Sequence, residues 1–444
     1  MKPVLCLDFG TSSIRAALRT ASGAIEVLDI GAVTASRSID SASIRSEICI
    51  DEDEDTIRFG ERAYEAFLAG KPQAFRQTSP KLWLKEPDKL NSFACPGISL
   101  TRKQLIAGLL AYAMFAASQT GKWQLPSSPD TSDVRVAHPV WPASTRGAAD
   151  TALAEVTWLA LNMASAGDWG ETSVDVLQSW TETDAGQTPL FNFEVDTLEP
   201  VAAAVELLPR ISNSRQVCVV VDVGAGTTDI GVFQSLSPDE VSGKENRLIP
   251  TGPTLSVFKA GNDIDRTLLR MMSESFPHQF KANRGDLEGR IRSIKESLFK
   301  QGAISEQGIH VRLSDLEQAS EMRAMTAEIR KNLKDAMLGA WHVIDTWLMS
   351  PNAVDKRIVV VMAGGGAEIR FLRDAVSRPM SLAGKLFELS VVTPQAPRGL
   401  VMHGAGYTRL AVALGGAGRL YKSVLHEHSQ LLRLPGLGQA KQRI

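Results

Sequence analysis

The feature that most constrains the fold of this chain is a strand-turn-strand pattern that occurs twice. Residues 4–18 pass from an apolar stretch through the polar turn Asp8-Phe9-Gly10-Thr11-Ser12-Ser13 into a second apolar stretch. Residues 217–233 repeat this pattern around Asp222 and the turn that follows it. Asp222 follows Asp8 by 214 residues, nearly half of the 444-residue chain. A hairpin repeated at this spacing predicts two related lobes.

The composition excludes several classes of protein. The 48 Lys and Arg residues against 50 Asp and Glu give a net charge of −2, so no overall field draws the chain to nucleic acid or anionic lipid. No apolar run reaches the roughly 18 to 20 residues that span a bilayer, and Asp8 interrupts the first apolar stretch early. The 4 cysteines lack metal-binding spacing. We therefore expect a cytoplasmic protein, with no nucleic-acid or membrane partner, whose cysteines are reduced and buried.

Apolar periodicity predicts helices and strands between and after the two hairpins. Helices are expected at residues 99–118, 144–163, 261–272, 286–299 and 316–348, and strands at 134–138 and 357–363. The acidic run 51–55 lacks a calcium-loop pattern and predicts a solvated hairpin turn.

These elements predict an α/β protein with three parts. Lobe I spans residues 1–200 and includes a surface insertion near 166–196, where Gly, Thr, Asp and Gln accumulate. Lobe II spans residues 201–414 and includes a helical subdomain at about 262–350. Residues 415–444 form a C-terminal tail with several basic residues.

The chemistry of the two turns favours phosphate binding. Asp229 stands where a dinucleotide fingerprint needs its third glycine, and a strand pattern follows instead of a helix. Consecutive backbone N–H groups in a tight turn still form an anion-binding concavity, to which hydroxyl side chains add donors. The aspartate before each turn is suited to hold the waters of a magnesium ion that bridges phosphates. The pair of turns therefore predicts a metal–nucleotide in a cleft between the two lobes.

At these residues the chain resembles the actin and sugar-kinase ATPase superfamily, and within it the nucleotide-binding domain of DnaK-type heat-shock chaperones. The resemblance covers residues 4–414 and implies an actin-like ATPase fold. The two turns are similar to that family's phosphate motifs, and residues 359–369 to its adenosine motif. Residues 198–204, Leu-Glu-Pro-Val-Ala-Ala-Ala, are similar to its segment that connects the lobes, and residues 261–265 to one of its helix starts.

The resemblance implies a role for each matched residue, with ATP or ADP and Mg²⁺ as cofactors. The implied catalytic residues are Lys81, Glu199 and Thr227. The metal would be held, largely through water, by Asp8, Asp222 and Asp229. The implied nucleotide-binding residues are Gly10, Thr11, Ser12, Ser13, Gly224, Ala225, Gly226, Thr227, Thr228, Lys295, Gly364, Gly365 and Gly366. Pro139 and Arg146 match residues that relay nucleotide state in the family, although a strand stop and a surface charge explain them equally well.

The chain departs from the family pattern at two positions that the resemblance places beside adenine. Glu296 and Glu368 stand where the family has two arginines that stack on adenine, and an acid cannot reproduce that stacking. We therefore expect weaker adenine binding or a repositioned base, with Arg292 and Arg370 as nearby substitutes. Ala225 replaces a glycine of the second phosphate motif.

The expected function is a chaperone-type molecular switch that binds ATP and hydrolyses it slowly. No acidic linker or peptide-binding domain is expected after residue 414, so the chain most resembles short relatives that lack that domain. We expect a monomer that acts with a protein partner or co-chaperone. The alternatives are a small-molecule kinase of the sugar-kinase type, an actin-like filament protein, and a pseudo-ATPase that binds nucleotide without hydrolysis.

Overall fold

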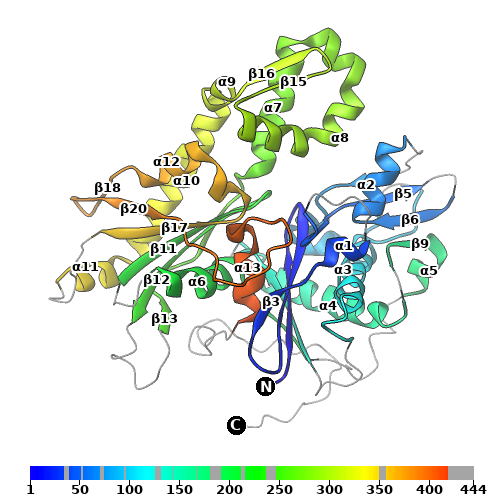
Figure 1. Cartoon of the computed structure of the whole chain (residues 1–444), viewed down its shortest axis with the longest axis horizontal. Coiled ribbons are helices and arrows are strands. Elements are labelled where there is room, and N and C mark those ends of the chain that lie inside the picture. The colour runs from blue at the N-terminus through cyan, green and yellow to red at the C-terminus, as the bar shows by residue number, and fades with distance from the viewer. Residues whose placement is uncertain are drawn as a thin grey trace. The chain divides into compact units, whose positions relative to one another are not determined.

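The structure is a computed structural model of the chain, and its contacts divide it into two compact units (Figure 1). Unit 1 comprises Met1–Glu206 with Ala396–Ile444, and unit 2 comprises Leu207–Gln395. Both units are mixed α/β, as the sequence predicted. The structure describes residues 1–34, 40–51, 54–70, 75–94, 97–125, 132–142, 144–167, 169–180, 192–211, 216–236, 247–349 and 357–418.

Unit 1 is built on a sheet with the strand order β10-β8-β1-β2-β3. Its hairpin consists of β1 (Val4–Phe9) and β2 (Ser13–Arg19), which pair antiparallel. On the far side of β1, β8 (Asp133–His138) and β10 (Asn192–Leu198) continue the sheet in parallel. Beyond β2 lies β3 (Ile25–Val27), and β4 (Ser43–Arg45) also pairs with β2. All six residues of β1 are buried, as expected for a central strand with both faces covered.

Unit 2 repeats this topology with the strand order β13-β12-β11-β17-β20. Its hairpin consists of β11 (Gln216–Val223) and β12 (Thr228–Leu236). The parallel strands β17 (Ile358–Ala363) and β20 (Leu389–Val392) follow β11 in the sheet. Beyond β12 lie β13 (Arg247–Pro250) and β14 (Leu255–Val257). Each strand of this sheet therefore has a counterpart in unit 1 with the same partner and direction.

The two hairpins also agree residue by residue. Asp8 pairs with Arg15 across the first hairpin, and Asp222 pairs with Asp229 across the second. In the first turn Gly10 N donates to Ser13 O at 3.1 Å, and in the second Gly224 N donates to Thr227 O at 2.9 Å. Both predicted hairpins are confirmed. In each hairpin the aspartate is the second-to-last residue of the first strand, next to the turn.

Helices α3 (Arg102–Gln119) and α4 (Arg146–Ala164) pack against each other in unit 1 and confirm two predicted helices. The start of α3 is fixed by a capping box, in which Gln104 N donates to Thr101 Oγ1 at 3.2 Å and Thr101 N donates to Gln104 Oε1 at 3.0 Å. Residues of α3 are buried on nearly all sides because the helix crosses the core of the unit. Shorter helices are α1 (Ile30–Thr34) and α2 (Glu61–Leu68).

Helix α13 (Tyr407–Ala417) belongs to unit 1, whereas the sequence predicts residues up to 414 to be part of lobe II. It packs on β1 and β2 through glycines. A Cβ at Gly415 would lie 1.8 Å from the carbonyl oxygen of Ala202 in α6 (Glu199–Leu207), and one at Gly416 would lie 2.3 Å from Cys6 Sγ. Glycine at these two positions permits α13 to pack this closely on β1 and α6. The boundary between the units accordingly follows residue 206 instead of residue 200.

The segment 166–196 contributes its described residues to two sheets of unit 1 and to a short helix, whereas residues 168 and 181–191 lie outside the described residues. It supplies the edge strand β10 of the main sheet and β9 (Glu171–Ser173) of a second sheet, ordered β7-β5-β6-β9. The other strands of that sheet are β5 (Ile48–Asp51), β6 (Thr56–Phe59) and β7 (Phe75–Gln77). Helix α5 (Val174–Ser179) follows, and Trp169 and Leu177 are buried. Burial of these two apolar side chains anchors residues 169–180 on the unit, while Glu171, Asp175 and Ser179 stay exposed.

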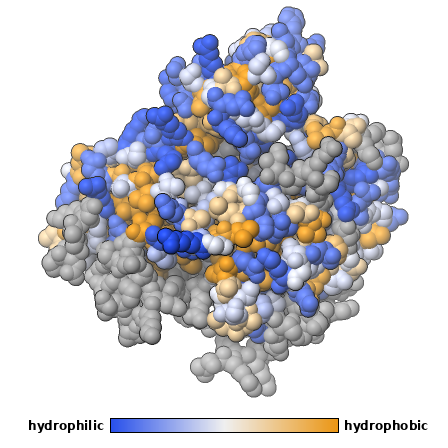
Figure 2. Space-filling view, viewed as in Figure 1, coloured by the Kyte–Doolittle hydropathy of each residue, from blue (hydrophilic) through white to orange (hydrophobic). Residues whose placement is uncertain are grey.

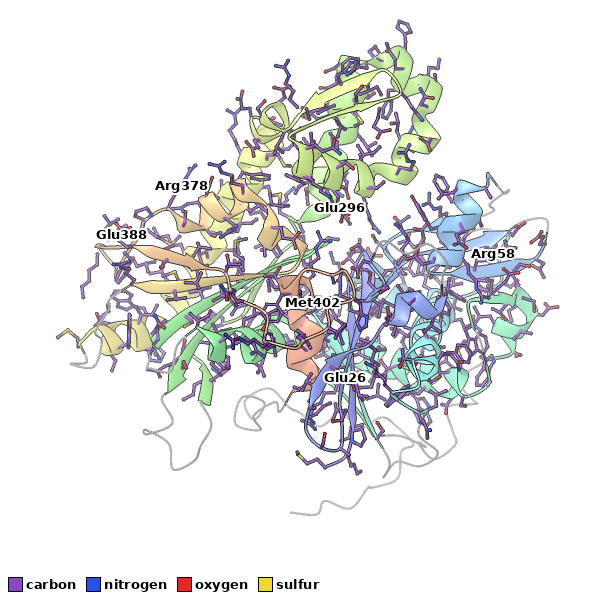
Figure 3. All side chains as sticks on the ribbon, viewed as in Figure 1. Glu26, Arg58, Glu296, Arg378, Glu388 and Met402 are labelled. Carbon is purple, nitrogen blue, oxygen red and sulfur yellow. The ribbon has the colours of Figure 1, made fainter. Side chains whose placement is uncertain are left out.

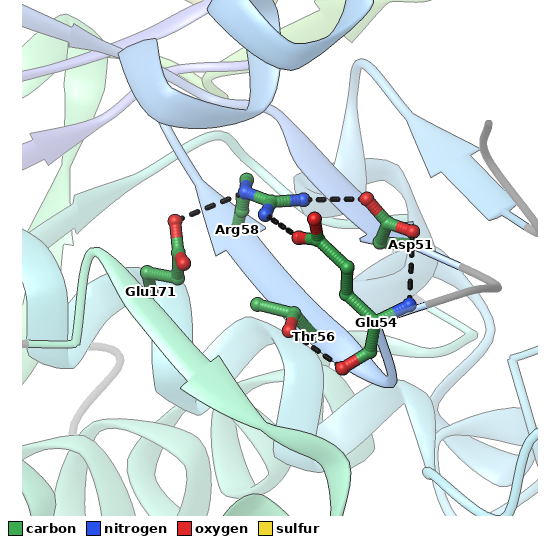
Figure 4. A network of polar contacts seen from close by, with 5 residues as sticks. All are labelled: Asp51, Glu54, Thr56, Arg58 and Glu171. Carbon is green, nitrogen blue, oxygen red and sulfur yellow. Dashed lines mark hydrogen bonds and ion pairs between the residues drawn. The ribbon is translucent and has the colours of Figure 1, made fainter. Parts of the chain in front are cut away.

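The acidic run 51–55 joins β5 and β6 in a hairpin, as predicted, and Glu54 and Asp55 are exposed, but Asp51 is not solvated. Asp51 is buried, and its Oδ2 accepts from Arg58 Nη1 at 2.9 Å. The same guanidinium binds Glu54, and its Nε donates to Glu171 Oε2 at 3.0 Å, as Figure 4 shows. Arg58 thus neutralises two carboxylates of the acidic run and one of the segment 166–196. The local sequence pattern did not reveal this pairing, because Glu171 is distant in the chain. Residues 52 and 53 lie outside the described residues.

Unit 2 carries a helical part after its hairpin. It contains α7 (Gly261–Ser275), α8 (Pro277–Gln301), the hairpin β15 (Ala303–Glu306) and β16 (Ile309–Arg312), and α9 (Leu313–Glu317). The stretch expected as one long helix at 316–348 is divided among α9, α10 (Ser320–Gly339) and α11 (Trp341–Met349). Hydrophilic residues cover most of the visible surface around α7 and α8 in Figure 2, in line with exposed pairs such as Arg284–Glu288.

The remaining elements of unit 2 are short. The 3-10 turn η6 (Gly365–Glu368) leads into α12 (Arg370–Ser377), and β18 (Met380–Leu382) pairs with β19 (Lys385–Phe387). Among the helices of the described ranges, none combines the length and apolarity that crossing a bilayer requires. The expectation of reduced, buried cysteines is confirmed for Cys6, Cys49 and Cys218, whereas Cys95 lies outside the described residues.

Candidate functional site

The candidate site in unit 1 lies at the carboxyl edge of the sheet. Asp8 is paired with Ala137 of β8, and Leu198 at the end of β10 is paired with His138. The three parallel strands therefore end together, and Glu199 follows directly as the first residue of α6. Ligands of open α/β sheets bind outside the carboxyl ends of such strands. Asp8 and Glu199 are both buried at this edge.

Lys81 reaches the same edge from a different part of the chain. It lies in the 3-10 helix η1 (Pro80–Lys85), whose first position is occupied by proline. Its Nζ forms an ion pair with Glu199 Oε1, and the two side chains are only 5% and 8% exposed. The structure thus brings together two of the three predicted catalytic residues. A buried lysine and a buried carboxylate stabilise each other mainly because neither tolerates burial alone.

The Asp8 carboxyl group has a perturbed affinity for protons. Burial and the nearby Glu199 charge raise the pKa of Asp8 from 3.8 to about 6, while Arg15 and Lys81 act in the opposite direction. Ionisation of Asp8 is therefore costly in the folded protein. A cation near its carboxylate would relieve that cost, so this residue is suited to a metal-bearing ligand.

The turn of the first hairpin is tightly constrained. A Cβ at Gly10 would lie 2.5 Å from Ser13 O, so a larger residue cannot close this turn without a shift. Ser46, which follows β4, donates its hydroxyl to Gly10 O at 2.7 Å and its N–H to Ser12 O at 3.1 Å. Ser46 is fully buried and was not predicted, because nothing in its local sequence marks it. Thr11 is also buried, whereas Ser12 and Ser13 are partly exposed.

The turn of the second hairpin holds two acids on one face. Asp222 and Asp229 stand directly opposite each other and are 6% and 1% exposed. Like charges in this cross-strand position repel, which favours a cation nearby. Thr227 is buried beside them. Thr228, however, is fully buried and donates its hydroxyl to Lys259 O at 2.7 Å, so that hydroxyl is committed inside the unit and is not a phosphate donor.

Lys295 of α8 lies beside this second turn. Gly261 N and Asn262 N, at the start of α7, donate to Gly224 O at 3.1 Å and Ala225 O at 2.7 Å. Lys295 Nζ contacts Gly261 O at 3.1 Å and Asp265 Oδ1 at 2.7 Å. The lysine is therefore brought to the turn as expected, although Asp265, which no prediction named as a site residue, already neutralises it.

The glycine turn after β17 lies against the same aspartate. Gly364 has a φ of 74°, and a Cβ there would lie 2.5 Å from Asp222 Oδ1. At Gly366 a Cβ would lie 2.3 Å from Val223 Cγ1. These two glycines are needed for close packing on the end of β11, whereas Gly365 is exposed. Gly364 and Gly366 therefore pack directly against the end of β11, beside the second turn of unit 2.

Glu296 and Glu368 are both exposed near this surface. Figure 3 labels Glu296 on α8, and Phe299 follows it by three residues in the same helix. Phe299 and Phe371 of α12 have ring centroids 6.3 Å apart, so α8 and α12 meet close to both glutamates. No described contact gives either glutamate the stacking role of an arginine. Arg370 is highly exposed and lies 3.8 Å from Asp374.

The carboxylates at the two turns suit a magnesium ion that is held mainly through its waters. Within the described ranges, no three His, Cys, Asp or Glu side chains gather as a metal site would require. Each turn instead offers a buried aspartate with a second carboxylate nearby, namely Glu199 for Asp8 and Asp229 for Asp222. Mg²⁺ usually keeps several waters and takes only one or two carboxylates together with phosphate oxygens. Asp8, Asp222 and Asp229 therefore fit the water-mediated role that the sequence implied.

Arg15 is the charged residue of the first turn that was missed. Its guanidinium lies 4.0 Å from Asp8 and 3.9 Å from Asp40. A signal for it existed, because Arg15 precedes Asp229 by the same 214 residues that separate the two first-strand aspartates. Alignment of the two hairpins would have placed it opposite Asp8. The relay role implied for Arg146 gains no support, since its described contact is a donation from Nη2 to Trp141 O at 3.5 Å.

Comparison with known proteins adds no family assignment. The chain matches no protein-family model and no curated protein.

Proposed function

We propose that this chain is an ATP-binding protein with an actin-like fold, which hydrolyses ATP slowly and acts as a DnaK-like chaperone-type switch on a protein partner. The observation that carries the proposal is the repeated hairpin: each unit holds a buried aspartate just before a tight turn, within the same five-strand order. Two such turns supply backbone N–H groups for phosphates and carboxylates for the waters of a cation.

The chemistry requires positioning and charge neutralisation more than covalent catalysis. Mg²⁺, when bound, would neutralise charge on the phosphates. Lys81 and Glu199 supply a cation and a carboxylate at the carboxyl edge of the first sheet, where they orient an attacking water and offset developing charge. Thr227 supplies a hydroxyl at the second turn. Burial of the Lys81–Glu199 pair supports this role, because a water-poor environment strengthens both interactions.

A single-turnover ATP hydrolysis assay tests the catalytic part of this proposal. Lys81→Ala should abolish turnover while leaving ATP binding measurable. Lys103→Ala is the matched control, because Lys103 is an equally buried lysine that pairs with Glu155 at 2.8 Å within the same unit. Turnover that survives in Lys81→Ala at the level of the control would refute the role of Lys81.

The pseudo-ATPase is the second candidate, and Glu296 and Glu368 favour it. Two carboxylates stand in place of arginines at the positions expected beside adenine. Because a carboxylate cannot stack on a base as a guanidinium does, we expect these positions to bind adenine weakly. ATP binding without any product in the same single-turnover assay would select this candidate over the slow ATPase.

A further inference from the structure

Two carbonyl oxygens of the first turn are held by one residue from another segment of unit 1. Ser46 follows β4 and is fully buried. Its hydroxyl donates to Gly10 O at 2.7 Å, and its backbone N–H donates to Ser12 O at 3.1 Å. Ser46 and Gly10 are 36 positions apart in the chain. A single buried serine thus fixes two of the peptide groups that form the turn.

The second turn has the same arrangement with different donors. Gly224 O and Ala225 O accept from the backbone N–H groups of Gly261 and Asn262, at 3.1 and 2.7 Å. Strand β14 pairs with β12 as β4 pairs with β2, and in each unit the donors come from the segment that follows this strand. The restraint of two turn carbonyls is therefore a property of both hairpins and not of one serine alone.

A carbonyl group that is held on one side of the turn directs an N–H group to the other side. A trans peptide unit is planar, and its N–H points away from its C=O. Gly10 O shares a peptide unit with Thr11 N–H, and Ser12 O shares one with Ser13 N–H. Ser46 therefore directs both of these N–H groups away from itself. A carbonyl that accepts a hydrogen bond also polarises its peptide unit, which makes the N–H a stronger donor.

We infer that Ser46 is a positioning residue of the first turn, which keeps the N–H groups of the turn directed to a phosphate and its carbonyl oxygens directed away. This inference rests on the proposed nucleotide function and adds a residue that acts through the turn, without a contact of its own to the ligand. An anion-binding turn needs successive N–H groups on one side. A turn whose Gly10 carbonyl could rotate to that side would present a negative dipole to the phosphate and bind it more weakly.

Ser132 offers a matched control in the same unit. It is also buried, its hydroxyl donates to Pro3 O at 3.3 Å, and it accepts from Trp123 Nε1 at 3.1 Å. Pro3 precedes β1, at the opposite end of that strand from the turn. Ser132→Ala should therefore lose at least as much stability as Ser46→Ala, because each removes a buried hydroxyl from a backbone carbonyl. Only Ser46→Ala should change the turn.

Calorimetric titration of the full chain with Mg–ATP, Mg–tripolyphosphate and adenosine tests the inference. Ser46→Ala should weaken both polyphosphate ligands by about 3- to 10-fold, the usual loss of one neutral hydrogen bond, and leave adenosine binding unchanged. Ser46→Thr keeps the hydroxyl and should recover most of that affinity. Ser132→Ala should bind all three ligands like the parent, with its loss of stability measured by urea unfolding. If Ser46→Ala does not fold, as judged by its thermal melt, Ser46→Cys takes its place, because a thiol is only a weak donor.

The outcomes separate this inference from the proposed function. ATP binding by the parent with unchanged affinity in Ser46→Ala overturns the inference alone, and so does an equal loss of affinity in Ser132→Ala. Tripolyphosphate binding that depends on Ser46, without any ATP binding, supports the inference and removes the ATP assignment. A parent that binds neither ATP nor tripolyphosphate overturns both.

Discussion

Replacement of Asp8 by asparagine should stabilise the protein at neutral pH while it weakens Mg–ATP binding. Asp8 is 6% exposed, and its pKa rises from 3.8 to about 6 on folding because of burial and Glu199. The folded state thus holds the Asp8 proton more tightly than the unfolded state. Stability contributed by the protonated group is present below pH 4 and is lost as the pH rises through 6.

The size of the effect follows from the two pKa values. A rise from 3.8 to about 6 corresponds to about 3 kcal/mol at pH 8, where the group is ionised in both states. The Asp8→Asn variant avoids that cost, so its free energy of unfolding should exceed that of the parent by up to about 3 kcal/mol at pH 8. At pH 4 the gain should fall below about 1 kcal/mol, because the parent is then protonated when folded.

Urea unfolding followed by tryptophan fluorescence measures this difference without Mg²⁺ or nucleotide. Six of the 8 tryptophans lie in residues 1–206, so the signal reports chiefly on the unit that holds Asp8. Asp88→Asn is the control, because Asp88 is exposed on a 3-10 turn of the same unit. An equal gain at pH 4 and pH 8, or a loss of stability at pH 8, would refute the reasoning.

Three further predictions concern catalysis, packing and thiol chemistry. Lys81→Ala should lose single-turnover hydrolysis and Lys103→Ala should keep it. Gly415→Ala should lower the free energy of unfolding by more than about 2 kcal/mol, because its Cβ would overlap a backbone oxygen; Gly285→Ala, with nothing within 4 Å in α8, should raise it by about 0.5 to 1 kcal/mol, and equal effects in urea unfolding would contradict the packing described. Burial raises the pKa of the Cys49 thiol to about 11, so in a Cys95→Ser variant an aromatic disulfide reagent at pH 8 should label no thiol before unfolding, and fast labelling of the native state would argue against this burial, which extends to Cys6, Cys49 and Cys218.

The hairpins could be predicted from the sequence because their information is local. An apolar run, an acid, a glycine turn and a second apolar run define each hairpin without reference to the rest of the chain. Glu199 and Lys81 required the resemblance, since 118 residues separate two side chains that pair in the fold. The structure pairs these two side chains, and their catalytic roles stay predictions.

Features that depend on long-range contacts could not be predicted in the same way. Ser46 and Arg15 belong to the site because of their neighbours in space, Gly10 and Asp8. The Thr228 hydroxyl donates to a backbone carbonyl 31 residues away in the chain. The return of α13 to unit 1 depends on two glycines that fit against β1 and α6, which composition alone does not reveal. At 169–180 the polar composition gave no sign that Trp169 and Leu177 are buried, because their burial depends on contacts with other parts of the unit.

Calorimetric titration of Mg–ATP into the parent, Asp8→Asn and Asp222→Asn tests the central claim most directly. If both related turns take part in Mg–ATP binding, the parent should bind Mg–ATP. Each substitution should weaken that binding by at least about tenfold, since each removes a carboxylate that binds the waters of the cation. Omission of Mg²⁺ should reduce the difference between parent and variants. The absence of binding to the parent at millimolar Mg–ATP, or equal affinity in all three proteins, would contradict the claim.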